Sequence, residues 1–330
     1  MDITRFTAQD TATVAGVVGM LNAATAVDSP DAFRETPASY AGYLRHGWDG
    51  ELPEAYVGRM PDGRIAGLVM VHTSEWDNTH LAWIDLVVHP HHRRSGDGSG
   101  LLSFAEARAR DLGRTSVGAD AWDRPAAIAF AAAHDFEQKS AAINRRQELD
   151  HVDRGLVDKL HEDALAHASA YELIHIAGRT PEELMDAVAT MTAAINDAPT
   201  DDLDIEDEVY PRERIEGYET AMLGRNRRFY RVVARHRETG ELAGHTVVTV
   251  EAERPELGWQ QDTSVVRAHR GHRLGVLVKS EMIRWLADIE PGLKSLDTWN
   301  AESNDHMIAV NEQLGYRVVA RILQFQRDVR

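Results

Sequence analysis

The chain contains no cysteine among its 330 residues. This excludes a disulfide framework, a zinc site with thiolate ligands and a cysteine nucleophile. No apolar run approaches the roughly 18 residues of a membrane-spanning helix. The first residues, Met1 to Arg5, also lack the basic-then-apolar order of a secretion signal. We therefore expect a cytoplasmic protein without a membrane partner.

Positive charge is also scarce. Lys and Arg total 36 against 53 Asp and Glu, which gives a formal net charge of −17. Such a balance disfavours a nucleic-acid partner, because neutralising a phosphate backbone requires clustered Lys and Arg. The charge fits a cationic or amine-bearing small molecule, although solubility alone explains it as well.

The length favours two domains, because single cores stop growing at about 250–300 residues. Apolar periodicity in residues 1–149 predicts a strand, two helices, three strands, a helix, a strand, a helix and one or two closing strands. The clearest local signal is the Asp-Gly turn at 62–63 between alternating apolar segments, which is typical of a β-hairpin.

The second half of the chain repeats the first. A three-residue insertion then aligns Asp135-Phe136 with Gly315-Tyr316. We predict a tandem duplication of one α/β (α+β) domain, with domains at 1–150 and 171–330 and a connector at 151–170. Six identities lie 177 residues apart: Gly67 and Gly244, Asp85 and Asp262, Val88 and Val265, Arg93 and Arg270, Gly98 and Gly275, Trp122 and Trp299.

A glycine-rich loop follows the strand-like run 81–88, and a helical pattern opens at Gly98. Glycines let backbone N–H groups approach a ligand, and a helix N-terminus adds a positive dipole end. The stretch 88–102 is therefore predicted to hold phosphate or pyrophosphate. The predicted contacts in the two copies are Val88, Arg93, Arg94, Gly96, Gly98 and Ser99, and Val265, Arg270, Gly271, His272, Arg273, Leu274 and Gly275.

The pattern Val-x-Pro-x-x-Arg-x-x-Gly-x-Gly, followed by Leu-Leu, resembles the acyl-CoA pyrophosphate loop of the GNAT N-acetyltransferase superfamily. The second copy matches it less fully and has Arg273 where the loop's first glycine stands. The segment 300–316 is similar to the family's later strand-to-helix segment beside the pantetheine arm, and it adds Asn300, Asn304 and Asn311 as candidate contacts. The first-copy matches are Val88, Pro90, Arg93, Gly96, Gly98 and Leu101-Leu102.

This resemblance covers nearly the whole chain, and tandem members of the family exist. It implies two GNAT-type domains, each with a mixed, mainly antiparallel central sheet flanked by helices. It also implies acetyl-CoA (coenzyme A) as co-substrate, no metal, and transfer of the acetyl group to a small-molecule amine. The amine would attack the thioester directly, because a ping-pong route through cysteine is impossible. We expect a monomer or a homodimer.

An acceptor amine must lose a proton, so a base is required. Asp85 and Asp262, on the strands that lead into the loops, are the candidate catalytic residues. The alternative is a structural carboxylate bonded to nearby backbone where the strand bends. Other residues fill the places of the family's usual glutamate base and tyrosine acid: Ala82 and Trp259, and Ala131 and Asn311.

The two copies are not equal. We expect the second to carry the chemistry, because its three asparagines could bond the pantetheine or the substrate and Arg273 adds a cation. The first would bind CoA or serve a structural role. A rival interpretation is a non-catalytic acyl-CoA-binding or sensing protein, and a nucleotide-phosphate site is disfavoured because no Gly-Lys-Ser/Thr follows the loop. The histidines at 89, 91 and 92 indicate a solvated loop rather than a metal site.

Overall fold

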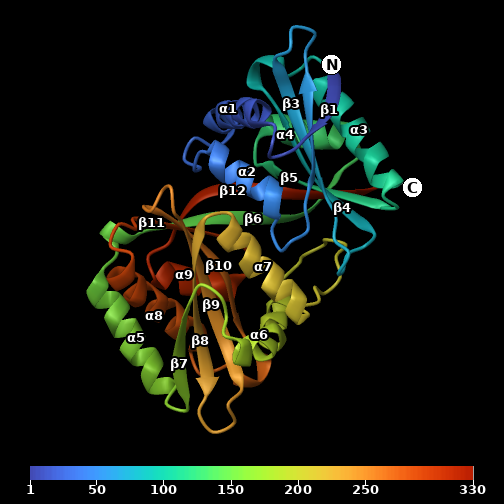
Figure 1. The fold of residues 1–330 in the computed structure, drawn as a ribbon. Helices are drawn as coiled ribbons and strands as arrows, with labels where there is room; N and C mark the ends of the chain where they lie inside the picture. Colours follow the sequence, from blue (N-terminus) through green and yellow to red (C-terminus); the bar gives the residue numbers. More distant parts are fainter. Residues whose placement is uncertain (330) are drawn as a thin grey trace. The chain divides into compact units, whose positions relative to one another are not determined.

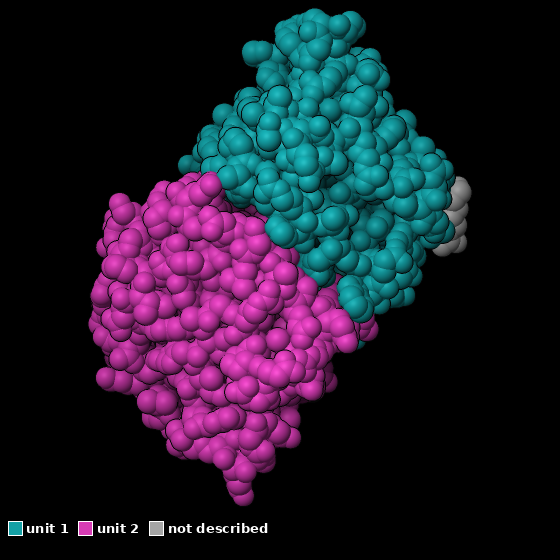
Figure 2. All heavy atoms as spheres, in the orientation of Figure 1, with its two compact units in different colours: residues 1–142, 200–208, 320–330 teal, residues 143–199, 209–319 magenta. Residues whose placement is uncertain are grey.

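The computed structural model describes residues 1–329, which form two compact units (Figures 1 and 2). Unit 1, teal in Figure 2, comprises residues 1–142, residues 200–208 and the C-terminal residues from 320 onward. Unit 2 comprises residues 143–199 and 209–319. Each unit thus contains segments from both halves of the sequence. The units therefore differ from a simple division near residues 150 and 170.

The first copy has the element order that its apolar periodicity predicts. Residues 137–148 form one closing strand, and not two. The elements are β1 (Asp2–Phe6), α1 (Thr11–Asp28), α2 (Pro37–His46), β2 (Glu54–Arg59), β3 (Ile65–His72), β4 (Leu81–Val88), α3 (Asp97–Asp111), β5 (Ser116–Trp122), α4 (Pro125–Ala133) and β6 (Glu137–Glu148).

The second copy repeats this order after an additional helix, and a short 3₁₀ turn precedes the third helix of each copy: η1 (Pro90–His92) and η5 (Arg267–His269). The elements are α5 (Arg154–His167), β7 (Tyr171–Ala177), α6 (Met185–Thr192), α7 (Arg212–Gly224), β8 (Arg227–His236), β9 (Leu242–Glu251), β10 (Leu257–Val265), α8 (Leu274–Ile289), β11 (Ser295–Ala301), α9 (Asp305–Gln313) and β12 (Arg317–Asp328).

Element starts correct one detail of the sequence alignment. Helices α3 and α8 start 177 residues apart, β5 and β11 start 179 apart, and β6 and β12 start 180 apart. Two of the three extra residues therefore precede β11. Trp299 consequently corresponds to Asp120, and Trp122 corresponds to Ala301. The pairing of the two tryptophans in the sequence was wrong, because a constant offset cannot place an insertion within a loop.

The closing strands of the two copies are exchanged. In unit 1 the strand order is β1-β2-β3-β4-β5-β12-β6, and in unit 2 it is β6-β11-β10-β9-β8-β7. Strand β12, from the second copy, pairs antiparallel with β5 from Ile322 opposite Trp122 to Asp328 opposite Ser116. Strand β6, from the first copy, lies beside β11. Each unit is thus completed by the last strand of the other copy.

The sheet of unit 1 is covered on both faces. Leu68 and Met70 of β3 pack into a cluster with α1 and α2, whereas Val69 and Val71 pack with α3. This alternation follows from the period of two along a strand. His72 lies two residues after Met70 and therefore points to the face covered by α1 and α2.

Helix α1 is the one helix of residues 1–329 that is long and apolar enough to span a membrane by length and composition. The sequence analysis expects no such run, so this expectation was wrong on composition. Length and composition are weak evidence of a span, because core helices pass the same test. Val14, Val17, Val18 and Met20 of α1 are buried in the cluster with β2 and β3, and the helix is one layer of unit 1.

Unit 2 has the same two-layer arrangement, with α5, α8 and α9 on one face of its sheet and α6 and α7 on the other (Figure 1). The expected connector at 151–170 is mainly the helix α5. Asp153 caps this helix by accepting a hydrogen bond from the Leu156 N–H (3.1 Å). Val157 and Ala164 of α5 are buried in the core that contains Leu277 of α8. The connector is thus part of the core of unit 2.

Candidate functional site

The two glycine-containing loops share one backbone conformation. In the first copy Arg94 and Gly96 have left-handed backbone angles, with φ of 66° and 87°. In the second copy the equivalent Gly271 and Arg273 have φ of 87° and 58°. Glycine and arginine have therefore exchanged places. Arg273 preserves the loop geometry although the family's glycine is missing there.

Each loop leads directly into the N-terminus of a helix. The first N–H groups of a helix have no acceptor within the helix, and in α3 these belong to Asp97, Gly98 and Ser99. The N-cap residues Gly96 and Arg273 provide no side-chain cap. The open N–H groups and the positive helix end suit an anion. These positions therefore fit a pyrophosphate.

The loop arginines are engaged elsewhere. Both terminal nitrogens of Arg93 bond the Asp28 carboxylate (2.8 and 2.6 Å), and its Nε donates to the Val88 carbonyl (3.1 Å). Arg270 repeats both contacts, with Asp197 (2.6 Å) and with the last carbonyl of β10 (3.1 Å). These predicted cofactor contacts fasten each loop to the segment after the first helix and to the end of its strand.

Other predicted loop residues also have partners within their unit. The Ser99 hydroxyl bonds His134 Nε2 (2.9 Å). The Arg273 guanidinium forms an ion pair with Asp163 of α5, which does not leave it as the free cation that the sequence suggests. The ring of His272 lies against that of Tyr171, and Val265 and Leu274 pack in the core of unit 2.

The three asparagines of the second copy have structural roles. Asn304 caps α9 by accepting a hydrogen bond from the Met307 N–H (3.1 Å). Asn311 is fully buried and donates to the Asn300 side-chain oxygen (2.8 Å). These contacts hold β11 and α9 together. The reason for placing the chemistry in the second copy is therefore weakened.

The histidines of the first loop stabilise the local turn. His89 Nδ1 accepts a hydrogen bond from the His91 N–H (3.2 Å), which caps η1. Residues 1–329 contain no group of three or more His, Asp or Glu side chains that could hold a metal ion.

A row of polar side chains crosses the sheet of unit 1 where β4 and β5 part. The two parallel strands pair from Leu81 opposite Ser116 to Trp83 opposite Gly118. Two residues further along each strand, on the same face, lie Asp85 and Asp120. The register therefore places the two carboxylates opposite each other just beyond the last pair.

Neighbouring elements bond both carboxylates. His72 Nε2 lies 2.9 Å from Asp85 Oδ2, and His72 Nδ1 lies 3.2 Å from the Tyr43 hydroxyl of α2. The Gln324 amide donates to Asp120 Oδ1 (3.2 Å). Gln324 stands on β12, so the exchanged strand of the second copy completes this row, which we call the polar row: Tyr43, His72, Asp85, Asp120 and Gln324.

The environment pushes the pKa values of the two carboxyl groups apart. Burial opposes ionisation of Asp85, but the charge and hydrogen bond of His72 outweigh it, so its pKa lies below the usual range. Burial raises the pKa of Asp120 to about 6, with the Gln324 amide opposing and the Asp85 charge adding to the effect. Both side chains still reach solvent, and 46% of the Asp85 side chain is exposed. Such pairs are typical of acid–base sites.

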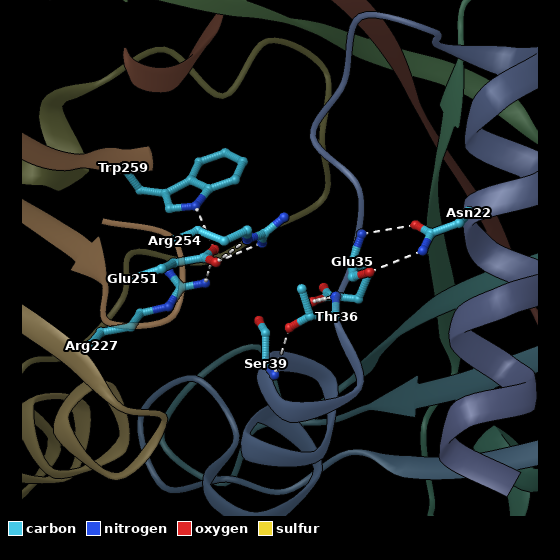
Figure 3. Close-up of polar contacts among 8 residues, drawn as sticks. All are labelled: Asn22, Glu35, Thr36, Ser39, Arg227, Glu251, Arg254 and Trp259. Carbon is cyan, nitrogen blue, oxygen red and sulfur yellow. Dashed lines mark hydrogen bonds and ion pairs between the residues drawn. The ribbon is translucent and has the colours of Figure 1, made fainter. Parts of the chain in front are cut away.

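Helix α2, which carries Tyr43, is anchored to α1. Asn22 bonds the backbone of Glu35 twice, through its oxygen to the N–H (2.8 Å) and through its nitrogen to the carbonyl (2.9 Å). Thr36 then caps α2 by accepting from the Ser39 N–H (3.1 Å), as the close-up shows (Figure 3). These bonds fix the start of the helix that presents Tyr43 to His72.

Unit 2 has a different arrangement at the equivalent place. Strand β10 is one residue longer than β4, and Gln261 and Asp262 both stand opposite Val247 in a β-bulge. From the last pair, Trp259 with Asp297, the register continues to Gln261 and Trp299. An aromatic ring thus replaces the second carboxylate.

Arginines neutralise two carboxylates near this end of β10. Arg146 bonds both oxygens of the buried Asp297 (2.6 and 3.0 Å). Glu251 accepts from Arg254 (2.8 Å) and from the Trp259 indole (3.4 Å), as seen in Figure 3. The predicted catalytic Asp262 lies near Tyr218 of α7. Burial, and then the charge of Asp262, raises the pKa of the Tyr218 phenol.

Sequence reasoning identified Asp85 but not the rest of the polar row. Asp120 carries the same signal as Asp85, an acidic residue inside a strand, and could have been found by it. His72 and Gln324 become candidates only through the pairing of their strands with β4 and β5.

A model of the Acetyltransferase (GNAT) family matches residues 22–136. A mycothiol acetyltransferase of Stackebrandtia nassauensis is 29% identical over 147 residues, which are 44% of this chain and 46% of that protein. The chain therefore aligns with about half the length of this curated relative.

Solved structures match over the whole chain. A tandem GNAT protein from the clavulanic acid biosynthesis pathway has a TM-score of 0.81 and 28% identity, with coverage of 100% of this chain and 98% of that one. A GCN5-related N-acetyltransferase from Sphaerobacter thermophilus has a TM-score of 0.64 and 17% identity, with coverage of 99% and 96%. The second likeness concerns the fold alone. The first is also a tandem protein, which agrees with the duplication.

Proposed function

The chain is a tandem-domain GNAT protein, and we propose from this premise that it is an acyl-CoA-dependent N-acetyltransferase. It moves an acetyl group from acetyl-CoA to a small-molecule amine. The name of the mycothiol acetyltransferase and the family of the matching model support this activity. The amine attacks the thioester directly, because the chain has no cysteine to carry an acyl group.

One observation carries the proposal. Two loops with the same pair of left-handed residues precede two uncapped helix N-termini. Open N–H groups and a positive helix end bind phosphates. The pyrophosphate of acetyl-CoA is therefore bound by the backbone of the loops, while Arg93 and Arg270 hold the loops in shape.

The transfer itself is assigned to unit 1. The asparagines that favoured the second copy bond to backbone and to each other. The polar row supplies carboxylates with separated pKa values where β4 and β5 part. We therefore assign the acceptor site to unit 1 and a second acyl-CoA loop to unit 2.

Calorimetry with acetyl-CoA tests the loops. Gly275→Glu adds negative charge at a helix start, where an added Cβ meets open space, and is expected to remove binding in the second copy. Gly98→Glu is expected to do the same in the first, and Gly275→Ala is the matched control that retains binding. Unchanged acetyl-CoA affinity and stoichiometry in both glutamate variants would show that the loops are not the binding sites.

Release of free thiol with a panel of amines tests the activity. Acetyl transfer liberates one CoA thiol for each amine acetylated. Measurable acetyl-CoA binding without thiol release on any amine would favour the rival interpretation, a non-catalytic acyl-CoA-binding or sensing protein.

A further inference from the structure

We propose that the two carboxylates of the polar row share the handling of a cationic amine in unit 1. Asp85 binds the ammonium group of the acceptor, and Asp120 takes the proton that this group must lose before it attacks. The inference rests on the proposed acetyltransferase function and adds the class of acceptor and the role of each residue.

Strand register gives the geometric basis. Asp85 and Asp120 lie two residues beyond the last β4–β5 pair, on one face of the sheet. A group placed between them contacts both strands at once, because the ladder that would otherwise join the strands has ended. The face is the one on which α2 presents Tyr43 to His72. The acceptor is therefore bounded by β4, β5 and α2.

Asp85 is suited to bind a cation. Its Oδ2 is oriented by His72, which in turn bonds Tyr43, so the carboxylate is held in one position. Its lowered pKa keeps it ionised at neutral pH. The described contacts of Asp85 include no Lys or Arg, and nearly half of its side chain is exposed. Its negative charge is thus available to an ammonium group.

Asp120 is suited to accept a proton. Gln324 occupies Oδ1, and Oδ2 has no hydrogen bond printed to the amide. A base works best when its pKa lies near the working pH, and Asp120 is closer to that range than Asp85. The charged or titratable groups around the pair are His72 from β3, Tyr40 and Tyr43 from α2, and Glu35 before α2.

The second copy provides an internal contrast. Its strands carry Trp299 in place of Asp120, and its buried Asp297 is neutralised by Arg146. It has Thr249 opposite Trp259, where the first copy has His72 opposite Trp83. The polar row is therefore a property of unit 1 and not of the duplicated fold.

The balance of the reaction assigns each proton. The ammonium group gives one proton to the Asp120 carboxylate, and the resulting amine forms an N–C bond to the thioester carbon. The C–S bond then breaks, and the second proton released from nitrogen ends on the CoA sulfur. The products are the N-acetyl amine and the CoA thiol, and Asp120 returns its proton to solvent.

Kinetics of the full-length protein with cationic amines test the inference. Asp120→Asn is expected to lower kcat by about 10²–10⁴-fold, the usual contribution of a positioned base. It should also remove the loss of activity that the wild type shows as pH falls through about 6. Asp85→Asn is expected to raise KM for cationic amines more than for neutral ones. Asp62→Asn, in an exposed turn, is the matched carboxylate-to-amide control.

Three outcomes separate the possibilities. A variant that keeps the wild-type melting temperature and acetyl-CoA affinity but loses kcat supports the inference. Full activity in Asp120→Asn, together with its loss in Asp262→Asn, overturns it and leaves the acetyltransferase function intact. Absence of thiol release by the wild type with any amine overturns the proposed function itself, which the variants alone cannot do.

Discussion

Gly96 and Arg273 occupy the same position in two loops of one chain, and both have left-handed backbone angles. A residue with a Cβ pays about 1 kcal/mol or more for this conformation. Arg273 tolerates it, and its side chain is tied to Asp163. The conservation of the shape, with different residues, indicates that the backbone conformation and not the side chain is what the loop requires.

Substitution of Gly96 by alanine measures this requirement. A Cβ at Gly96 would meet nothing within 4 Å, so the cost comes from φ alone. We expect Gly96→Ala to lower the free energy of unfolding by about 1 kcal/mol. Gly275→Ala, in a helix and in open space, should leave it unchanged or raise it slightly. Urea unfolding of both variants provides the measurement, and equal effects would argue against strain at Gly96.

Lys279 gives a prediction about pH. It lies in α8 at the position of the core residue Leu102, is 1% exposed, and its Nζ is 5.0 Å from the centre of the Tyr316 ring. Burial lowers its pKa to about 7. The unfolded chain therefore binds this proton below its usual pKa of about 10.5, while the folded protein binds it only near 7. Stability is lost as pH falls from about 10.5 to 7.

Lys279→Met is accordingly expected to be more stable than the wild type at pH 7, by at most roughly 5 kcal/mol. The difference should shrink as pH rises towards 10.5. Urea unfolding at pH 7 and pH 10 gives the measurement, and Lys159→Met, at an exposed position of α5, is the control. The same difference at both pH values would contradict a neutral buried lysine.

The sequence predicts the local features well. Periodicity and turn residues are properties of adjacent residues, and they predict the element order of the first copy correctly. The duplication is visible because Asp85, Val88 and their counterparts at a constant spacing survive. The bulge at Gln261 and Asp262 is not visible, because an extra residue in a strand is defined only against its partner strand.

The candidate site is predicted in part for the same reason. Asp85 has a local signal, an acid within an apolar strand. Asp120 has this signal too, but the sequence alignment matched the nearby Trp122 to Trp299 and drew attention away from it. Gln324 lies 204 residues from Asp120. Only the pairing of β12 with β5 brings the two together.

The exchanged strands predict that the first sequence half does not fold alone. A fragment of residues 1–150 lacks β12, and the edge of β5 that pairs with β12 is then open to aggregation. Its own β6 could replace β12, because the two correspond at a spacing of 180 residues. Arg145 would then stand at the place of Phe325, which packs with Ala131 and Ala141.

A guanidinium buried without a partner there costs several kcal/mol. The isolated fragment is therefore expected to be insoluble or unfolded by circular dichroism, and Arg145→Phe is expected to make it more soluble. Co-expression with a fragment of residues 151–330 should restore a soluble pair that copurifies, because each fragment then receives its missing strand. A monomeric wild-type fragment that unfolds cooperatively would mean that β6 takes the place of β12 without penalty, and that the exchange contributes little to the stability of unit 1.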